Sequence, residues 1–228
     1  MAASKPQLYV KRDIQRSDAA SIQALSQVST GWIVDANGKR GAIDSAIRPI
    51  SEKTSFCGTA FTVRTRGRDN LAAWAALAFA KPGDVLVLAT DSYTESSVVG
   101  DVFIGMARNL GIVAVITDGM VRDVAGINAV GIPVFARGLS PNSPYKDGPG
   151  ELGTKVCVGN MFIESGDILR GDADGVVVVE RQNASAVVLD MERIREQETR
   201  MDKWVHGGLS TPPWLQEFLS ADKVSYID

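Results

Sequence analysis

Short apolar runs alternate with helical patterns through the middle of the chain, and this alternation constrains the fold more than any other feature. The run VLVLAT at 85–90 has no polar alternation, which is typical of a parallel strand covered on both faces. The strand-like runs are 57–67, 85–90, 112–117 and 132–138, with helical patterns at 69–84 and 98–111 and a short helix or turn after Asp118. The rhythm predicts an α/β core with parallel pairing over 57–138.

The segments outside this core differ in character. Residues 1–12 read as a lead-in without regular structure, and helical spacing follows over 13–28. Pro and Gly are frequent in 140–153, which predicts a long loop. Short strands joined by turns over 154–179 predict antiparallel pairing, including a turn at 171–175.

An amphipathic helix is expected over 183–204, with Asn183 as its N-cap. The tail beyond it carries Trp214, Leu215 and Phe218, large apolar side chains that need cover from another surface. We therefore expect a single domain over 1–228 with its core at about 25–180. The segment 183–228 is expected to serve in oligomer contacts.

Composition excludes several classes of protein. The net charge is −3 and no long run has one sign, so neither a nucleic acid nor a membrane surface is an expected partner. No apolar run approaches the roughly 18–20 residues of a membrane span, and the N-terminus lacks a signal sequence, which together predict a cytoplasmic protein. Cys57 and Cys157 lie in apolar, strand-like surroundings and are expected to be reduced core residues.

Polar side chains gather where the predicted strands end. Asp101, Arg122 and Asp123 follow two of these strands, and Asp69–Asn70 follows a third. In open α/β sheets, sites form beyond the carboxyl ends of the strands. Asp101 and Asp123 would suit a hard divalent ion such as Mg²⁺, and Arg122 would hold a substrate carboxylate. The plainer alternative is a polar turn with a surface ion pair.

Other catalytic patterns are weak. His206 is the only histidine and lies in a Gly-flanked tail, and neither cysteine belongs to a CxxC pair, which argues against a zinc site. No GxSxG elbow, GxGxxG loop or P-loop occurs. Hydrolase triads and nucleotide-dependent chemistry are therefore not expected.

The residues do resemble one known family. Asp101, twenty residues and then Arg122–Asp123 form the D-X20-R-D pattern of the class II 4-hydroxy-4-methyl-2-oxoglutarate/4-carboxy-4-hydroxy-2-oxoadipate aldolases, which belong with the regulator of ribonuclease activity A (RraA) proteins. The likeness runs from about Leu25 to Val179 and includes GTAFTVRT, DNLAAWAAL, GIVAVITDGMVRD and GDILRGDADGVVVV. Members that act only as ribonuclease regulators are said to lack the first aspartate, which this chain keeps.

The resemblance implies a β-β-α swivelling-domain sandwich that assembles as a homotrimer or homohexamer. It makes Asp123 the direct ligand of Mg²⁺, Mn²⁺ or another divalent cation, and Asp101 a partner acting through metal-bound water. Arg122 would contact the substrate, and the pyruvyl group would lie against Asn70 and the backbone of Val98, Val99 and Gly100. Two points depart from the family or stay open: Gly126 stands where many members have an acid, and Glu196 or Glu198 would be the glutamate lent by a neighbouring subunit.

The function implied is metal-dependent cleavage of a 4-hydroxy-2-oxo acid that releases pyruvate, with oxaloacetate decarboxylation as a side activity. The substrate would be a small 2-oxo acid, and the metal with Arg122 would stabilise the pyruvate enolate as it forms. The alternative, from a different class, is a non-catalytic binder that regulates a ribonuclease.

Overall fold

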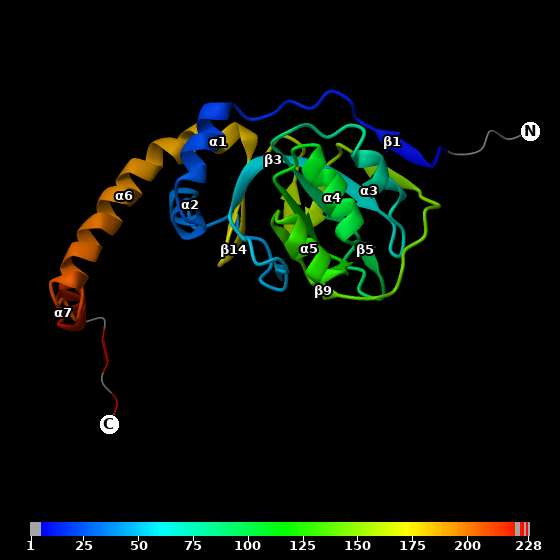
Figure 1. Cartoon of the computed structure of the whole chain (residues 1–228). Helices are drawn as coiled ribbons and strands as arrows, with labels where there is room; N and C mark the ends of the chain where they lie inside the picture. The colour runs from blue at the N-terminus through cyan, green and yellow to red at the C-terminus, as the bar shows by residue number, and fades with distance from the viewer. Residues whose placement is uncertain (1–5, 222–223, 226, 228) are drawn as a thin grey trace, which may run out of the picture.

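A nine-stranded sheet forms the centre of the protein, and helices cover parts of both faces (Figure 1). The structure is a computed structural model, and it describes residues 6–221, 224, 225 and 227. The strands of this sheet are β1 (Leu8–Val10), β2 (Arg48–Pro49), β3 (Phe56–Thr65), β4 (Asp84–Ala89), β6 (Ala114–Thr117), β8 (Val134–Ala136), β10 (Gly150–Leu152), β13 (Ile168–Asp172) and β14 (Gly175–Val179).

The strands β3, β4, β6 and β8 lie side by side in that order and run parallel, as the sequence predicts. Their side chains alternate between two separate cores. In β4, Leu86 and Leu88 belong to the core under one face, whereas Val85 and Val87 belong to the core under the other. Both faces are covered, which explains why these strands show continuous apolar runs.

Each of the later parallel strands leads into a short strand of a second sheet before the chain turns into a helix or loop. The second sheet is parallel and consists of β5 (Ser97–Val99), β7 (Met120–Val121) and β9 (Gly138–Leu139). The helices on this side are α3 (Leu71–Ala76), α4 (Asp101–Asn109) and α5 (Val124–Val130). The successions β4-β5-α4 and β6-β7-α5 confirm the expected β-β-α architecture.

The opposite face carries the antiparallel part of the chain. The hairpin of β11 (Val156–Val158) and β12 (Met161–Ile163) contributes Val156, Val158 and Ile163 to the core on that face. The hairpin of β13 and β14 confirms the turn expected at 171–175. Helices pack around this second hairpin: α1 (Ala19–Ser26), α2 (Thr30–Ala36) and α6 (Ala184–His206), the last preceded by a 3-10 turn at Arg181–Asn183.

Helix α6 begins where expected but soon leaves the body of the protein. Its buried side chains are all in its first half, from Ala184 to Ile194, and Figure 1 shows the rest running outward to α7 (Pro213–Leu219). Trp204, Trp214 and Phe218 are 41%, 60% and 49% exposed on this arm, residues 195–221. None of the helices in the described part of the chain is long and apolar enough to cross a membrane.

Several predicted boundaries are wrong. The pattern over 98–111 begins with strand β5, because the β-branched pair Val98–Val99 favours extended backbone and the helix starts only at Asp101. The helix predicted over 69–84 is α-helical only in α3. The turn that follows has hydrogen bonds between residues three apart, as in a 3-10 helix, and the chain leaves the helical conformation before Pro82. The chain after Asp118 forms β7 before α5.

Two segments expected to lack strands contribute to the central sheet. Strand β10 lies inside the predicted loop 140–153, where it pairs with the half of β3 that β13 leaves open. Strand β1 lies inside the predicted lead-in and pairs with β10, while residues 1–5 of that lead-in lie outside the described residues.

The first helix starts later than predicted, at Ala19, because the Asp18 side chain caps it by accepting from the Ser21 amide. Helix α2 was not expected.

Both cysteines are free thiols, but only one has the expected surroundings. Cys57 packs against the core between β13–β14 and the helices, and burial raises the pKa of its thiol to about 11. Cys157 is exposed, because side chains alternate along β11 and its neighbours Val156 and Val158 take the buried face. The prediction of a second core cysteine is therefore wrong.

Candidate active site

The ends of the parallel strands surround a cavity of about 140 Å³ between α3, the β5–α4 junction and the β7–α5 turn. Seven site residues predicted from the sequence line it, whereas Asp69, Glu196 and Glu198 do not. The seven are Asn70, Val98, Val99, Gly100, Asp101, Arg122 and Asp123. The structure thus brings together side chains that come from separate strand ends.

Asp123 has the least usual backbone at the site. It precedes the first turn of α5 in the left-handed region, with φ 63° and ψ 47°, and its side chain makes no capping hydrogen bond. Such a conformation is uncommon outside glycine, and at an active site it is a recognised sign of a functional constraint. Its carboxylate instead lies against Gly100, where a Cβ would collide with Oδ2.

Asp101 is the first residue of α4 and faces the neighbouring helix. Its Oδ1 accepts from the amide of Val102 at 2.7 Å, and its carboxylate lies against Gly126 of α5. The absence of a side chain at Gly126 makes room for it, as Gly100 does for Asp123. Asp101 lies at the N-terminus of α4 and Asp123 at the N-terminus of α5, where the helix dipole favours negative charge.

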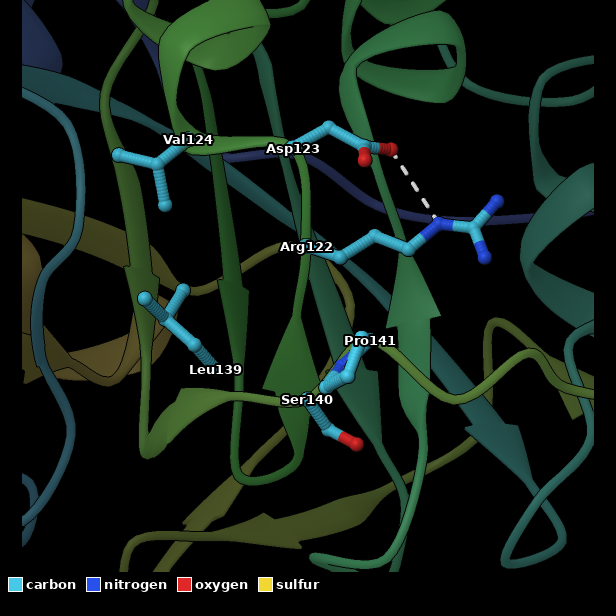
Figure 2. Close-up of a pocket in the computed structure, with 6 residues that line it drawn as sticks. All are labelled: Arg122, Asp123, Val124, Leu139, Ser140 and Pro141. Carbon is cyan, nitrogen blue, oxygen red and sulfur yellow. Dashed lines mark hydrogen bonds and ion pairs between the residues drawn. The ribbon is translucent and has the colours of Figure 1, made fainter.

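Arg122 is held in place from two sides. Its Nε donates to Asp123 Oδ2 at 3.2 Å and its Nη1 donates to Ser143 Oγ at 2.7 Å. Figure 2 shows Arg122 and Asp123 pointing to the same side of the turn, away from Val124 and Leu139. A second cavity, of about 310 Å³, shares Arg122 and Asp123 with the first and is otherwise lined by Val124, Leu139, Ser140 and Pro141.

Two side chains with polar atoms, Asn70 and Trp74, line the α3 side of the cavity. Asn70 Nδ2 donates to the Val98 carbonyl at 2.8 Å, which ties the start of α3 to β5. Asn70 Oδ1 and Trp74 Nε1 are both buried and have no hydrogen-bond partner among the described residues. A ligand or a water molecule can supply the partner that such atoms lack.

The donor set fits a hard divalent cation. Among the described residues no group of three or more His, Cys, Asp or Glu side chains could hold a metal. Asp101 and Asp123 remain, and Mg²⁺ is commonly held by one or two carboxylates, with water and substrate oxygens completing its shell. The chemistry of the two oxygen-donor side chains thus suits Mg²⁺ or Mn²⁺ rather than a thiolate or histidine metal.

Two other acids near the strand ends have structural tasks. Asp118, 2% exposed, accepts from the amides of Thr90 and Ser92 and fixes the loop after β4. Asp69 likewise accepts from the amides of Leu71 and Asp147. Their charge is satisfied inside the protein, and neither lines the 140 Å³ cavity.

Sequence reasoning missed five polar or aromatic residues of the cavity, among them Ser97 and Phe103. Ser143 and Lys146 come from the long loop before β10, whose position no local pattern reveals. Trp74 could have been found, because it follows Asn70 by four residues in a helical pattern and therefore shares its face of α3.

Comparison with known proteins places the chain in a family. The family model RraA-like (Aldolase/RraA) matches residues 17–178. A Halalkalibacterium halodurans protein, provisionally named a 4-hydroxy-4-methyl-2-oxoglutarate aldolase, is 36% identical over 152 residues, which cover 67% of this chain and 72% of that protein.

Solved structures agree in fold. RraAS2 of Streptomyces coelicolor, described as an unusual member of the RNase ES inhibitor RraA protein family, matches with a TM-score of 0.74 at 24% identity over 84% of this chain and 99% of its own. An uncharacterized protein from Pseudomonas syringae pv. tomato matches with a TM-score of 0.76 at 22% identity over 86% of this chain and 96% of its own. On the family match and the similarity in sequence, the chain belongs to the RraA-like family.

Proposed function

We propose that the protein is a divalent-metal-dependent aldolase that cleaves a 4-hydroxy-2-oxo acid and releases pyruvate. The observation that carries this proposal is the single cavity at which Asp101, Arg122 and Asp123 meet. The provisional name of the 36% identical relative supports the same reaction class. The substrate would be of the 4-hydroxy-4-methyl-2-oxoglutarate or 4-carboxy-4-hydroxy-2-oxoadipate type.

Arg122 binds the oxo-acid end of the substrate. Its bonds to Asp123 and Ser143 leave the planar guanidinium in one orientation, which suits a carboxylate and the adjoining keto oxygen. The backbone of Val98, Val99 and Gly100 and the Asn70 side chain line the same cavity, and the Arg122 amide donates to the Val99 carbonyl. As the bond between C3 and C4 breaks, negative charge develops on the keto oxygen, and Arg122 is placed to stabilise it.

Asp123 would hold Mg²⁺ or Mn²⁺ directly, and Asp101 would act through water. When bound, the cation supplies a Lewis acid for the keto oxygen. Asp101 accepts the proton of the C4 hydroxyl through a water molecule, and water returns a proton to the pyruvate enolate. The same residues would decarboxylate oxaloacetate, since loss of CO₂ from that substrate also leaves pyruvate enolate.

The arm offers a route for a neighbouring subunit to reach the site. The side chains of Val187, Met191 and Ile194 are buried on the body, and the same stripe of α6 continues through Glu198. Glu198 is half-buried, whereas Glu196 points off this stripe and is exposed. We propose a homotrimer or homohexamer in which Glu196 or Glu198 enters the neighbouring subunit's site.

The test is a pyruvate-release assay with added Mg²⁺ or Mn²⁺. We expect release from 4-hydroxy-4-methyl-2-oxoglutarate that EDTA abolishes and excess Mg²⁺ restores. Arg122→Ala should lower kcat/KM by about 100-fold or more, because it removes a group that stabilises charge in the transition state. Arg122→Lys should recover only part of this, since a lysine lacks the planar fork.

Three results would overturn the proposal. Activity that survives EDTA would exclude the metal-dependent route, and full activity in Arg122→Ala would exclude the role of the guanidinium. If wild type releases no pyruvate and instead binds and inhibits a ribonuclease, the protein is a non-catalytic regulator. Light scattering on the same preparation measures whether it is a trimer or a hexamer.

A further inference from the structure

Two of the buried polar atoms that lack a partner lie at the same cavity. In the described part of the chain these atoms are Asn70 Oδ1, Trp74 Nε1 and Ser96 Oγ, and only Asn70 and Trp74 line the 140 Å³ cavity. Leaving a buried donor or acceptor without a hydrogen bond is unfavourable. Two such atoms on residues of one cavity make this wall a candidate binding subsite.

The backbone and neighbouring side chains fix both groups. Asn70 immediately precedes α3 and Trp74 lies four residues later within it, and both residues line the 140 Å³ cavity. Asn70 Nδ2 is already bonded to the Val98 carbonyl, which leaves the acceptor oxygen as the uncommitted atom. The Trp74 ring packs edge-to-face on Phe103, with centroids 5.4 Å apart and planes at 85°.

We propose that Trp74 and Asn70 form the subsite for the C4 hydroxyl of the substrate, which makes Trp74 a specificity-determining residue. This inference rests on the proposed function. When the wall opens, it offers one N–H donor and one oxygen acceptor, and a hydroxyl group both accepts and donates. Trp74 Nε1 donates to the hydroxyl oxygen, and the hydroxyl group donates to Asn70 Oδ1. For the reaction, the hydroxyl group rotates and donates to the water at Asp101 instead.

Both atoms are covered in the ligand-free protein. Substrate binding therefore has to open the α3 wall of the cavity, and the two new hydrogen bonds favour the opening. A substrate without a group at this position gains neither bond. The site then selects for a 4-hydroxy acid, because a pocket built to hydrogen-bond a hydroxyl disfavours analogues that lack it.

The subsite should affect the two reactions of the enzyme differently. In aldol cleavage the C4 oxygen loses its proton and becomes a carbonyl oxygen, and the Trp74 N–H can stay bonded to it throughout. In oxaloacetate the corresponding group is a carboxylate that leaves as neutral CO₂. A donor to that carboxylate stabilises the charged starting state, so it does not accelerate decarboxylation.

The experiment compares Trp74→Phe with wild type on 4-hydroxy-4-methyl-2-oxoglutarate and on oxaloacetate, using one preparation of each protein. We expect kcat/KM for the hydroxy acid to fall about tenfold, the value of one hydrogen bond. The kcat for oxaloacetate should not fall. Because both rates come from the same sample, a partly unfolded fraction cancels in their ratio.

Trp32→Phe is the matched control, since Trp32 of α2 is also half-buried but packs against the core around β13 and β14 and does not line the cavity. Its ratio of the two activities should equal that of wild type. A parallel fall of both activities in Trp74→Phe, an unchanged ratio, or the same change in Trp32→Phe would overturn the subsite alone. A wild type inactive on both substrates would overturn the proposed function and the subsite with it.

Discussion

Gly126 offers a sharp test of how the two helices place Asp101. A Cβ built on Gly126 would lie 2.6 Å from Asp101 Cβ and 2.7 Å from Asp101 Cγ, and it would collide with Oδ2. Rotating the carboxylate cannot relieve the contact with Asp101 Cβ, because that atom is bonded to the backbone of α4. Gly126→Ala therefore forces α4 and α5 apart or displaces Asp101.

The size of the effect follows from two opposing terms. Alanine in a helix is favoured over glycine by about 1 kcal/mol. Overpacking a close contact typically destabilises by about 1–3 kcal/mol. We therefore expect Gly126→Ala to leave the free energy of unfolding lower by about 0–2 kcal/mol. Displacement of Asp101 by about 1 Å should lower kcat/KM for aldol cleavage about 100-fold.

Gly105 supplies the matched control on α4. The nearest atom to a Cβ there is Val130 Cγ2 at 3.7 Å, an ordinary contact. Gly105→Ala should raise the free energy of unfolding by about 1 kcal/mol and leave the activity unchanged. Urea unfolding followed by circular dichroism, beside the pyruvate assay, measures both. If Gly126→Ala is as stable and as active as Gly105→Ala, Asp101 does not lie against α5 and the reasoning is refuted.

Three further predictions concern stability and reactivity. Arg16 donates to the buried carboxylate of Asp84 at 3.0 and 2.8 Å. Arg16→Met should therefore lower the free energy of unfolding, measured by urea unfolding, by about 3 kcal/mol. A loss under about 1 kcal/mol would contradict a buried ion pair. Since burial raises the pKa of Cys57 to about 11, a thiol reagent at pH 8 should modify Cys157 quickly and Cys57 only after unfolding; equal rates would contradict this. Burial raises the pKa of Asp167 above 3.8, so the folded protein holds this proton more tightly than the unfolded chain. The free energy of unfolding should therefore fall as pH rises from the unfolded-state pKa to the folded-state pKa of this carboxyl. Asp167→Asn should remove that fall from unfolding curves measured across this pH range.

The sequence predicts the parallel core and the meeting of the acids because both follow from strand ends. Strands that run parallel in one sheet end at the same edge, so the loops that carry Asp101 and Asp123 can converge there, although the sequence alone does not fix how closely the two side chains approach. The short strands β5, β7 and β9 are only two or three residues long, and no periodicity can reveal them. Their order is visible only in the folded chain or through the family resemblance.

The remaining differences come from long-range partners. Strand β10 forms because β13 pairs with only the first part of β3, and the open edge accepts Gly150–Leu152. Asp118 follows a predicted strand in the sequence, as the candidate site acids do, yet its two carboxylate oxygens accept from the amides of Thr90 and Ser92. Such bonds depend on how distant segments meet, so local residue patterns cannot separate a structural acid from one available to a ligand.

Asp18 and Asp123 show what distinguishes the two kinds of acid. Each precedes a helix, where an aspartate ordinarily accepts from the amides of the first turn. Asp18 does so with extended backbone, φ −71° and ψ 152°, and its carboxylate is committed to Ser21. Asp123 is left-handed instead, and its side chain accepts nothing from α5. The left-handed backbone of Asp123 disfavours folding by on the order of 1 kcal/mol. In return, it directs the carboxylate away from α5 and beside Arg122, where a cation can reach it. Asp123→Asn, which tolerates the same backbone, should therefore fold normally and lose metal-dependent activity; normal activity in that variant would mean that the carboxylate has no ligand to hold.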